Sequence, residues 1–209
     1  MNLDAQILFQ NASDSIKAGE LSKARELLLK AQESSPDSPD ILRLMSVVAA
    51  LNFDYVGALE LINQAIILEP KNGVSYSNKG NILKFLGRHD EAIACFDEAI
   101  KLLPNYSEAY NNKANTLQDI HCYEEALVWY DKAIALQPNY VEAYCNKGNA
   151  LEWLRRHDEA MENFNKATQI DPNYVDAYWQ KAMNQLATGN FETGLANRPP
   201  RPTCRRPFR

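Results

Sequence analysis

The chain has 209 residues, of which 45% are hydrophobic, and a net charge of −5. It contains no apolar run long enough to cross a bilayer, and residues 1–10 lack the basic start and apolar core of a signal peptide, so we expect a cytoplasmic protein that binds no membrane. Five arginines lie between positions 196 and 209 without an acidic residue, so residues 1–195 carry −10 and disfavour nucleic acid, whose phosphates need a continuous basic surface.

Residues recur along the chain with a period of 34. One proline per repeat stands at the same place: Pro36, Pro70, Pro104, Pro138 and Pro172. Two columns of alanine keep the same interval, namely Ala24, Ala58, Ala92, Ala126 and Ala160, and Ala31, Ala65, Ala99, Ala133 and Ala167. Three columns in one period predict a repeat array. The predicted repeats are 5–38, 39–72, 73–106, 107–140 and 141–174, with an incomplete sixth over 175–195.

Each repeat contains two amphipathic helical patterns. In the repeat 107–140 they cover Ser107–Ile120 and Glu124–Leu136. The first helix is expected to stop at Gly19, Gly87 and Gly189 in their repeats, because glycine accepts positive φ. The second helix is expected to stop at the proline, which cannot continue it. The sequence therefore predicts an all-α solenoid of antiparallel helix pairs.

Small residues in the first helix predict a close approach between the helices of a pair. Gly80, Ala114 and Gly148 share one column, in which a larger side chain would separate the two helices. Aromatic residues supply the bulk that fills the space between successive repeats. A lone pair cannot bury this face, so each repeat depends on its neighbours.

The most regular part of the chain is similar to a known repeat. It reads Ala-Tyr-x-Asn-Lys-Gly-Asn at Ala143–Asn149, Asp-Glu-Ala at Asp158–Ala160 and Asp-Pro-Asn-Tyr at Asp171–Tyr174. This pattern resembles the tetratricopeptide repeat over residues 5–195, most strongly over 73–182. The resemblance implies a right-handed superhelix whose first helices line a concave groove, and a role in holding other proteins. The array also resembles the bacterial-type arm of O-GlcNAc transferase-like proteins.

The residue types that most often carry catalysis or bind metals are scattered. His89 and His157 occupy equivalent places at the start of second helices, and His121 lies in an inter-helix turn, so we interpret all three as structural. No repeat joins Ser, His and Asp, and none places two histidines one helical turn apart for zinc. The four cysteines lack metal-type spacing and are predicted to be free thiols. We therefore expect no enzyme activity, no metal and no cofactor.

Six asparagines form the candidate binding site, which we call the asparagine ladder. They recur as pairs three residues apart on the first helices of three successive repeats: Asn78, Asn81, Asn112, Asn115, Asn146 and Asn149. Residues three apart share one helix face, which we expect to face the groove. Each amide has a donor and an acceptor that match a peptide bond, so the ladder is predicted to bind the backbone of an extended peptide. Alternatively, the second asparagine of each pair bonds to the neighbouring helix and fixes repeat stacking.

Residues around the ladder indicate the chemistry of the peptide. In relatives that bind the carboxyl terminus of chaperones, Lys or Arg precedes the first asparagine of a pair, whereas here that column reads Arg43, Ser77, Asn111, Cys145 and Trp179. Within this column we predict that Asn111 is accessible and contacts the peptide. Acids predicted on the groove side include Glu108 and Glu142, while Phe85 and Trp153 offer apolar surface. We therefore expect a neutral or basic extended segment rather than a carboxylate.

The end of the chain differs from the repeats. Residues 196–209 are rich in proline and arginine, and Pro199 and Pro200 cannot continue the helix that residues 191–195 begin. This C-terminal end or tail is a candidate site of self-association. The main hypothesis is a non-catalytic scaffold or adaptor that binds an extended peptide. Two alternatives remain, the substrate-binding arm of a larger glycosyltransferase and a homo-oligomeric structural array.

Overall fold

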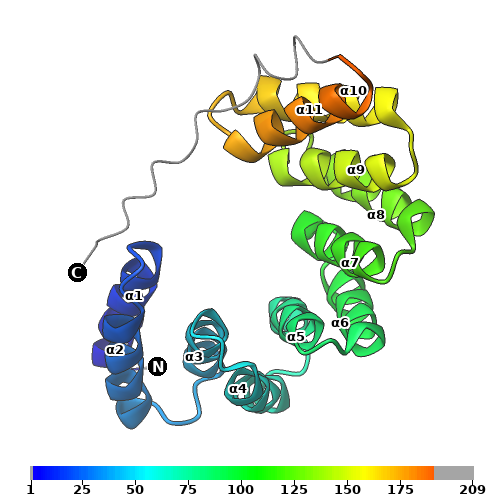
Figure 1. Ribbon diagram of the computed structural model, residues 1–209. Coiled ribbons are helices and arrows are strands. Elements are labelled where there is room, and N and C mark those ends of the chain that lie inside the picture. The colour runs from blue at the N-terminus through cyan, green and yellow to red at the C-terminus, as the bar shows by residue number, and fades with distance from the viewer. Residues whose placement is uncertain (1, 191–209) are drawn as a thin grey trace. The chain divides into compact units, whose positions relative to one another are not determined.

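The computed structural model describes residues 2–190, and these residues form α-helices without a strand (Figure 1). They fall into an N-terminal body, up to Thr116, and a C-terminal body, from Leu117 onwards. Each body is described by itself. The predictions for the tail, for Cys204 and for the helix expected at 191–195 lie outside the described residues. None of the helices within residues 2–190 has the length and hydropathy of a membrane span.

The N-terminal body consists of helix pairs. Its helices are α1 (Leu3–Lys17), α2 (Leu21–Ser34), α3 (Pro39–Leu51), α4 (Tyr55–Leu68), α5 (Gly73–Phe85) and α6 (His89–Leu102), followed by the start of α7 (Ser107–Asp119). The partners α1 and α2, α3 and α4, and α5 and α6 pack along each other. In addition, α3 contacts α1 and α2, and α5 contacts α3 and α4. Each first helix therefore packs on the preceding pair as well as on its own partner.

The C-terminal body has the same arrangement. Its helices are α8 (Tyr123–Leu136), α9 (Val141–Trp153), α10 (His157–Ile170) and α11 (Val175–Ala187). The pair of α9 and α10 packs together, α9 also contacts α8, and α11 contacts both α9 and α10. The two bodies confirm the predicted all-α class. The helices predicted at Ser107–Ile120 and Glu124–Leu136 differ from the observed ones by one residue at a single end each.

A left-handed residue ends the first helix of every described pair. The predicted glycines adopt this conformation, with φ of 77° at Gly19, 73° at Gly87 and 83° at Gly189. Three larger residues do the same at the equivalent positions, namely Phe53 (63°), His121 (65°) and Arg155 (57°). The left-handed conformation turns the chain back so that the backbone can satisfy carbonyls at the end of the helix. In the turn at Phe53, the Phe53 N–H donates to the Ala50 carbonyl and the Asp54 N–H donates to the Ala49 carbonyl.

In two of the helix pairs, a glycine of the first helix leaves room for an aromatic ring of the second. In α5, a Cβ added to Gly80 would meet the ring of Phe96 in α6, and in α9 a Cβ on Gly148 would meet the ring of Phe164 in α10. Both rings are fully buried, as are the alanine columns of the second helices. The close helix approach predicted from this column is confirmed at Gly80 and Gly148, where an added Cβ would collide with the ring.

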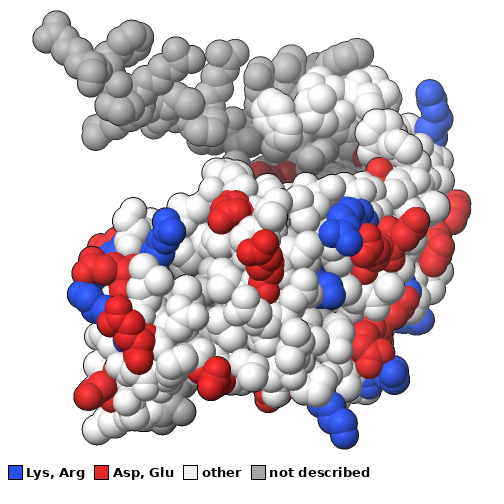
Figure 2. All heavy atoms as spheres, turned by 90° about the horizontal axis from the view of Figure 1, so that it is seen from below, with Lys and Arg blue, Asp and Glu red and all other residues white. Residues whose placement is uncertain are grey.

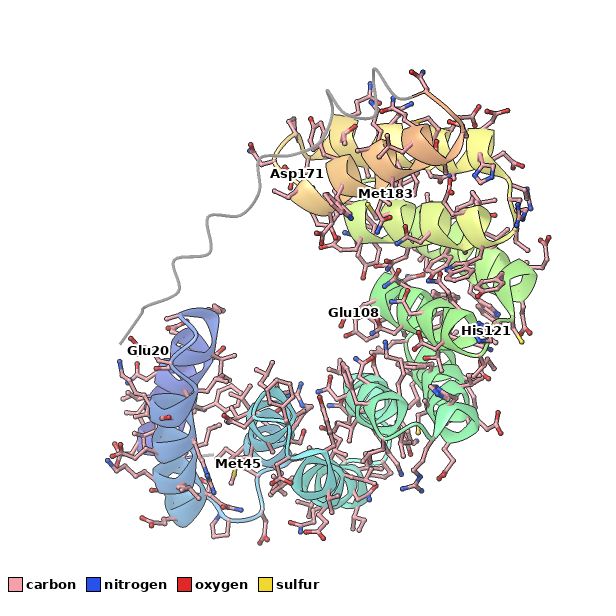
Figure 3. The ribbon with its side chains drawn as sticks, in the orientation of Figure 1. Glu20, Met45, Glu108, His121, Asp171 and Met183 are labelled. Carbon is pink, nitrogen blue, oxygen red and sulfur yellow. The ribbon has the colours of Figure 1, made fainter. Side chains whose placement is uncertain are left out.

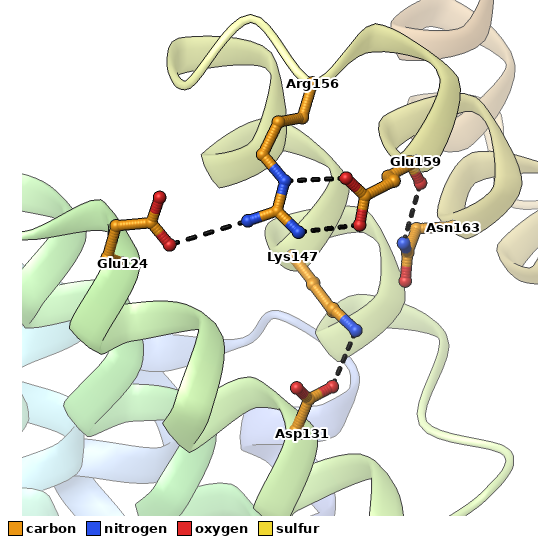
Figure 4. Close-up of polar contacts among 6 residues, drawn as sticks. All are labelled: Glu124, Asp131, Lys147, Arg156, Glu159 and Asn163. Atoms are coloured by element: carbon orange, nitrogen blue, oxygen red, sulfur yellow. Dashed lines mark hydrogen bonds and ion pairs between the residues drawn. The ribbon is translucent and has the colours of Figure 1, made fainter.

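Ion pairs join two of the first helices, α7 and α9, to the second helix of the preceding repeat. The Lys113 Nζ lies 2.5 Å from Asp97 Oδ1, and the Lys147 Nζ lies 2.6 Å from Asp131 Oδ1. In Figure 4, Arg156 donates two hydrogen bonds to Glu159 and also reaches Glu124 of α8, at 3.5 Å. The lysines therefore lay their stems along the helix interface and act in stacking.

We expect Gly148→Ala to lower the free energy of unfolding by about 1–3 kcal/mol, because the new methyl group displaces the Phe164 ring. This direction opposes helix propensity, which favours alanine over glycine. Urea unfolding followed by circular dichroism measures the change. The same substitution is also made in a Phe164→Leu background, in which the smaller side chain leaves room for the methyl group. The first repeat already contains this combination, with Leu28 and Ala12 at the equivalent positions. An equal loss in both backgrounds would show that the ring is not what the methyl group meets.

Candidate peptide-binding surface

The first ladder pair lies at the wall of an apolar pocket in the N-terminal body. The pocket has a volume of about 370 Å³ and is formed by α3, the turn after it, α4 and α5. Its lining residues are Val47, Ala50, Leu51, Phe53, Tyr55, Asn78, Asn81, Ile82 and Phe85. The structure therefore brings three predicted site residues, Asn78, Asn81 and Phe85, to one concave surface. The other lining residues, apart from Ile82, come from the preceding repeat, and none of them was predicted.

Stacked aromatic rings form one side of this apolar pocket. The rings of Tyr55 and Phe85 lie 5.1 Å apart and nearly parallel, at 10°. Phe53 packs edge-on against Tyr55 at 6.4 Å and remains 79% exposed. Since Phe53 and Tyr55 follow α3 and Phe85 ends α5, the cluster spans two successive repeats.

The polar side of the apolar pocket consists of two amides. Asn78 and Asn81 are half-buried on α5. Within residues 2–190, neither side-chain amide has a hydrogen-bond partner in the protein. A half-buried amide that lacks a partner retains its donor and acceptor for a ligand or water.

The second ladder pair lies on α7, in the part that belongs to the N-terminal body. Asn112 and Asn115 are half-buried, whereas Asn111 is only 4% exposed. Asn111 and Asn115 have interactions within the protein. The prediction that Asn111 lies on an accessible surface is therefore wrong, because this column is covered by packing. Glu108, labelled in Figure 3 near the start of α7, is exposed and accepts a hydrogen bond from the Tyr106 hydroxyl at 2.9 Å.

The third ladder pair lies on α9 in the C-terminal body. Asn146 and Asn149 are half-buried, and Trp153 at the end of the same helix is 68% exposed. The Trp153 ring stacks on Tyr123 of α8 at 5.8 Å and 8°. This stack stands two repeats after that of Tyr55 and Phe85 and has a similar geometry.

The polar surroundings of the third pair differ from those of the first. His121, labelled in Figure 3, lies in the turn after α7, and its Nδ1 is 2.8 Å from the Tyr123 hydroxyl. Glu142 is exposed in the first turn of α9. Burial raises the pKa of Tyr174 to about 12, and Cys145, Glu142 and other nearby acids add to the shift. The start of α9 is therefore a locally negative environment.

The histidines predicted at the starts of second helices lie at those positions. His89 and His157 begin α6 and α10, as predicted, and the His157 Nδ1 lies 3.0 Å from Glu152 Oε2. No group of three or more His, Cys, Asp or Glu side chains within residues 2–190 could hold a metal ion. On the face seen in Figure 2, basic side chains lie among acidic ones rather than in one continuous patch.

The comparisons with known proteins agree with this geometry. Sequence models of the tetratricopeptide repeat match residues 74–106, 141–174 and 95–128, and one described as a TPR repeat matches 123–152. The type IV pilus biogenesis factor PilW has a similar structure, with a TM-score of 0.85 and 19% identity over 94% of this chain and 91% of that one.

Two further solved structures are also similar. Pseudomonas aeruginosa PilF has a TM-score of 0.79 and 19% identity over 93% of this chain and 88% of that one. YrrB, described as a TPR protein with an unusual peptide-binding site, has a TM-score of 0.60 and 22% identity over 83% of this chain and 90% of that one. The comparison with curated proteins found no match.

The paired helices and the similar solved structures define an all-α solenoid of stacked helix pairs. Residues 74–174 of the chain consist of tetratricopeptide repeats. Members of this family are in general non-catalytic scaffolds that bind peptide segments of partner proteins.

Two cysteines, Cys145 of α9 and Cys122 in the turn before α8, should differ in their reactivity toward alkylating reagents because they differ in burial. Burial raises the pKa of the Cys145 thiol to about 12, with Asp176 and Glu142 adding to the shift, whereas Cys122 is exposed. A thiol with a raised pKa stays protonated and is a poor nucleophile. In the folded protein at pH 8, we expect iodoacetamide to modify Cys122 and to spare Cys145, as read by peptide mass spectrometry. Equal modification rates before unfolding would contradict the buried position of Cys145.

Proposed function

We propose that the chain is an interaction scaffold that binds an extended segment of another protein through the asparagine ladder. The observation that carries this proposal is the pair of amides of Asn78 and Asn81, which have no partner within residues 2–190 and border an apolar pocket. An extended peptide exposes both N–H and C=O groups, and an asparagine side chain complements either. The equivalent residues Asn112 and Asn146 stand at intervals of 34 on α7 and α9.

The charge near the ladder supports a neutral or basic ligand. Glu108 and Glu142 are exposed in the first turns of α7 and α9, and beside the three ladder pairs the column that would supply cations contains buried Ser77, Asn111 and Cys145. The cation of this column, Arg43, lies one repeat earlier and is paired with Asp40. A carboxylate ligand would meet like charge there without a compensating Lys or Arg. The peptide-binding site of YrrB, which has a similar fold, makes this use of the fold reasonable.

Exposed surfaces at the ends of the first helices support side-chain contacts in addition to backbone contacts. Phe85 and Trp153 each present a ring that is more than 60% exposed and is held by a stacked tyrosine. Rings fixed in this way lose little conformational entropy on binding. We therefore assign the rings to contact with ligand side chains and the ladder to contact with its backbone.

We expect the triple variant Asn78→Ala, Asn112→Ala, Asn146→Ala to bind peptides about one to three orders of magnitude more weakly. Each neutral hydrogen bond contributes about 0.5–1.5 kcal/mol, and about 1.4 kcal/mol is a factor of ten in affinity. The probe is a synthetic peptide chosen by selecting a random 12-residue display library on the full chain. Isothermal titration calorimetry measures its Kd for the parent and the variant.

The matched control changes three asparagines at the same interval outside the ladder. Asn105, Asn139 and Asn173 are exposed in the turns between repeats, so their replacement by alanine should leave the Kd unchanged. Thermal unfolding of both variants separates lost binding from lost fold. If the ladder variant keeps the parent affinity, the asparagines act in repeat stacking and the proposed function fails.

A further inference from the structure

The apolar pocket beside Asn78 is lined without any charged side chain. Apolar atoms of Val47, Leu51 and Ile82 and the rings of Phe53, Tyr55 and Phe85 surround about 370 Å³. This space is at the small end of the range found for ligand sites, so it suits one large side chain better than a whole cofactor. Burial of an apolar group there would remove both apolar surfaces from water without desolvating a charged side chain.

We propose that this pocket anchors one bulky apolar side chain, of leucine size or larger, from the extended peptide, and so sets the sequence specificity of the scaffold. The inference rests on the proposed function and adds the class of residue recognised. The amides of Asn78 and Asn81 stand at the wall of the same pocket. A side chain that enters it brings its own peptide bond alongside these amides, so a single residue satisfies both surfaces.

The two amides also favour this occupant over others. A partner helix has already satisfied its backbone groups internally, and a lipid chain has none, so either would cover Asn78 and Asn81 without offering a hydrogen bond. Covering an unsatisfied amide costs free energy. An extended peptide with an apolar side chain offsets this cost, because its free N–H and C=O groups can form hydrogen bonds with the two amides.

The equivalent position in the C-terminal body shows that the apolar lining is particular to the first site. The stack of Tyr123 on Trp153 and the pair Asn146 and Asn149 recur there, two repeats later. The remaining lining residues become polar or small: Gln118 stands for Ala50, Asp119 for Leu51, His121 for Phe53 and Ala150 for Ile82. Repeat architecture therefore keeps the stack and the amides, whereas the apolar walls are specific to the N-terminal pocket.

The backbone at Phe53 gives an independent indication of use. Its φ of 63° is a conformation that costs free energy for an aromatic residue. Glycine occupies the equivalent place at Gly19, Gly87 and Gly189, and His121 and Arg155 occupy it in the other two turns. The ring gains little burial in return, because it is 79% exposed. A strained and exposed ring at the rim of an apolar pocket is explained if a ligand covers it.

The test uses the full chain and the selected 12-residue peptides. We expect these peptides to share one bulky apolar residue, and its replacement by alanine to weaken binding about 10- to 100-fold, as burial of such a side chain implies. In Leu51→Asp, which copies Asp119 of the second site, and in Phe53→Gly, the parent peptide and its alanine version should bind equally. Phe53→Gly should also raise the melting temperature, which excludes misfolding as the cause.

The control is His121→Gly, which relieves the same backbone strain in the second site and should leave the apolar preference intact. If binding depends on Asn78 but the selected peptides share no apolar residue, the pocket proposal is overturned and the proposed function stands. If the preference persists in Leu51→Asp and Phe53→Gly, another surface reads the side chain and the proposal is again overturned. If no peptide depends on the ladder, the proposed function fails and this inference fails with it.

Discussion

The contact between a glycine in the first helix and an aromatic ring in the second determines how closely the two helices of a pair can approach. At Gly80 and Gly148 the fully buried rings of Phe96 and Phe164 occupy the space that a Cβ would take. In these two pairs the alanine columns of the second helix are also fully buried. Within each body, an ion pair then joins a first helix to the preceding second helix, Lys113 to Asp97 and Lys147 to Asp131.

The same first helices carry the core on one face and the candidate binding residues on the other. On α5, Gly80 and Leu83 are buried against α6, whereas Asn78, Asn81 and Phe85 border the apolar pocket. Because the core face already fixes the helix, the opposite face need not contribute to folding. It therefore tolerates asparagine, a mediocre helix former, and leaves amides without protein partners.

Sequence periodicity predicted the helices well because the spacing of glycine, alanine and proline has a local steric cause. The left-handed turn at Arg155 could not be predicted in this way, since nothing in an arginine side chain favours positive φ and only the register shows its role. The apolar pocket was missed because half of its lining comes from the preceding repeat, so no single repeat contains its pattern. Asn111 was placed on an accessible surface, but it is 4% exposed, and the burial of a polar residue depends on tertiary packing that its position in the repeat does not reveal.

The construction of the apolar pocket from two successive repeats has a consequence for how such a protein diversifies. Duplication of a single repeat would copy the core of one helix pair but only part of the pocket lining. The reason is that α3 and α4 of one repeat supply one side of the pocket and α5 of the next repeat supplies the other. Duplication of two adjacent repeats together copies the whole site. The recurrence of the stacked rings at that longer interval matches this requirement. Two copies of one inherited pocket are then free to acquire different ligand preferences through surface substitutions, without any change to the helices that hold them.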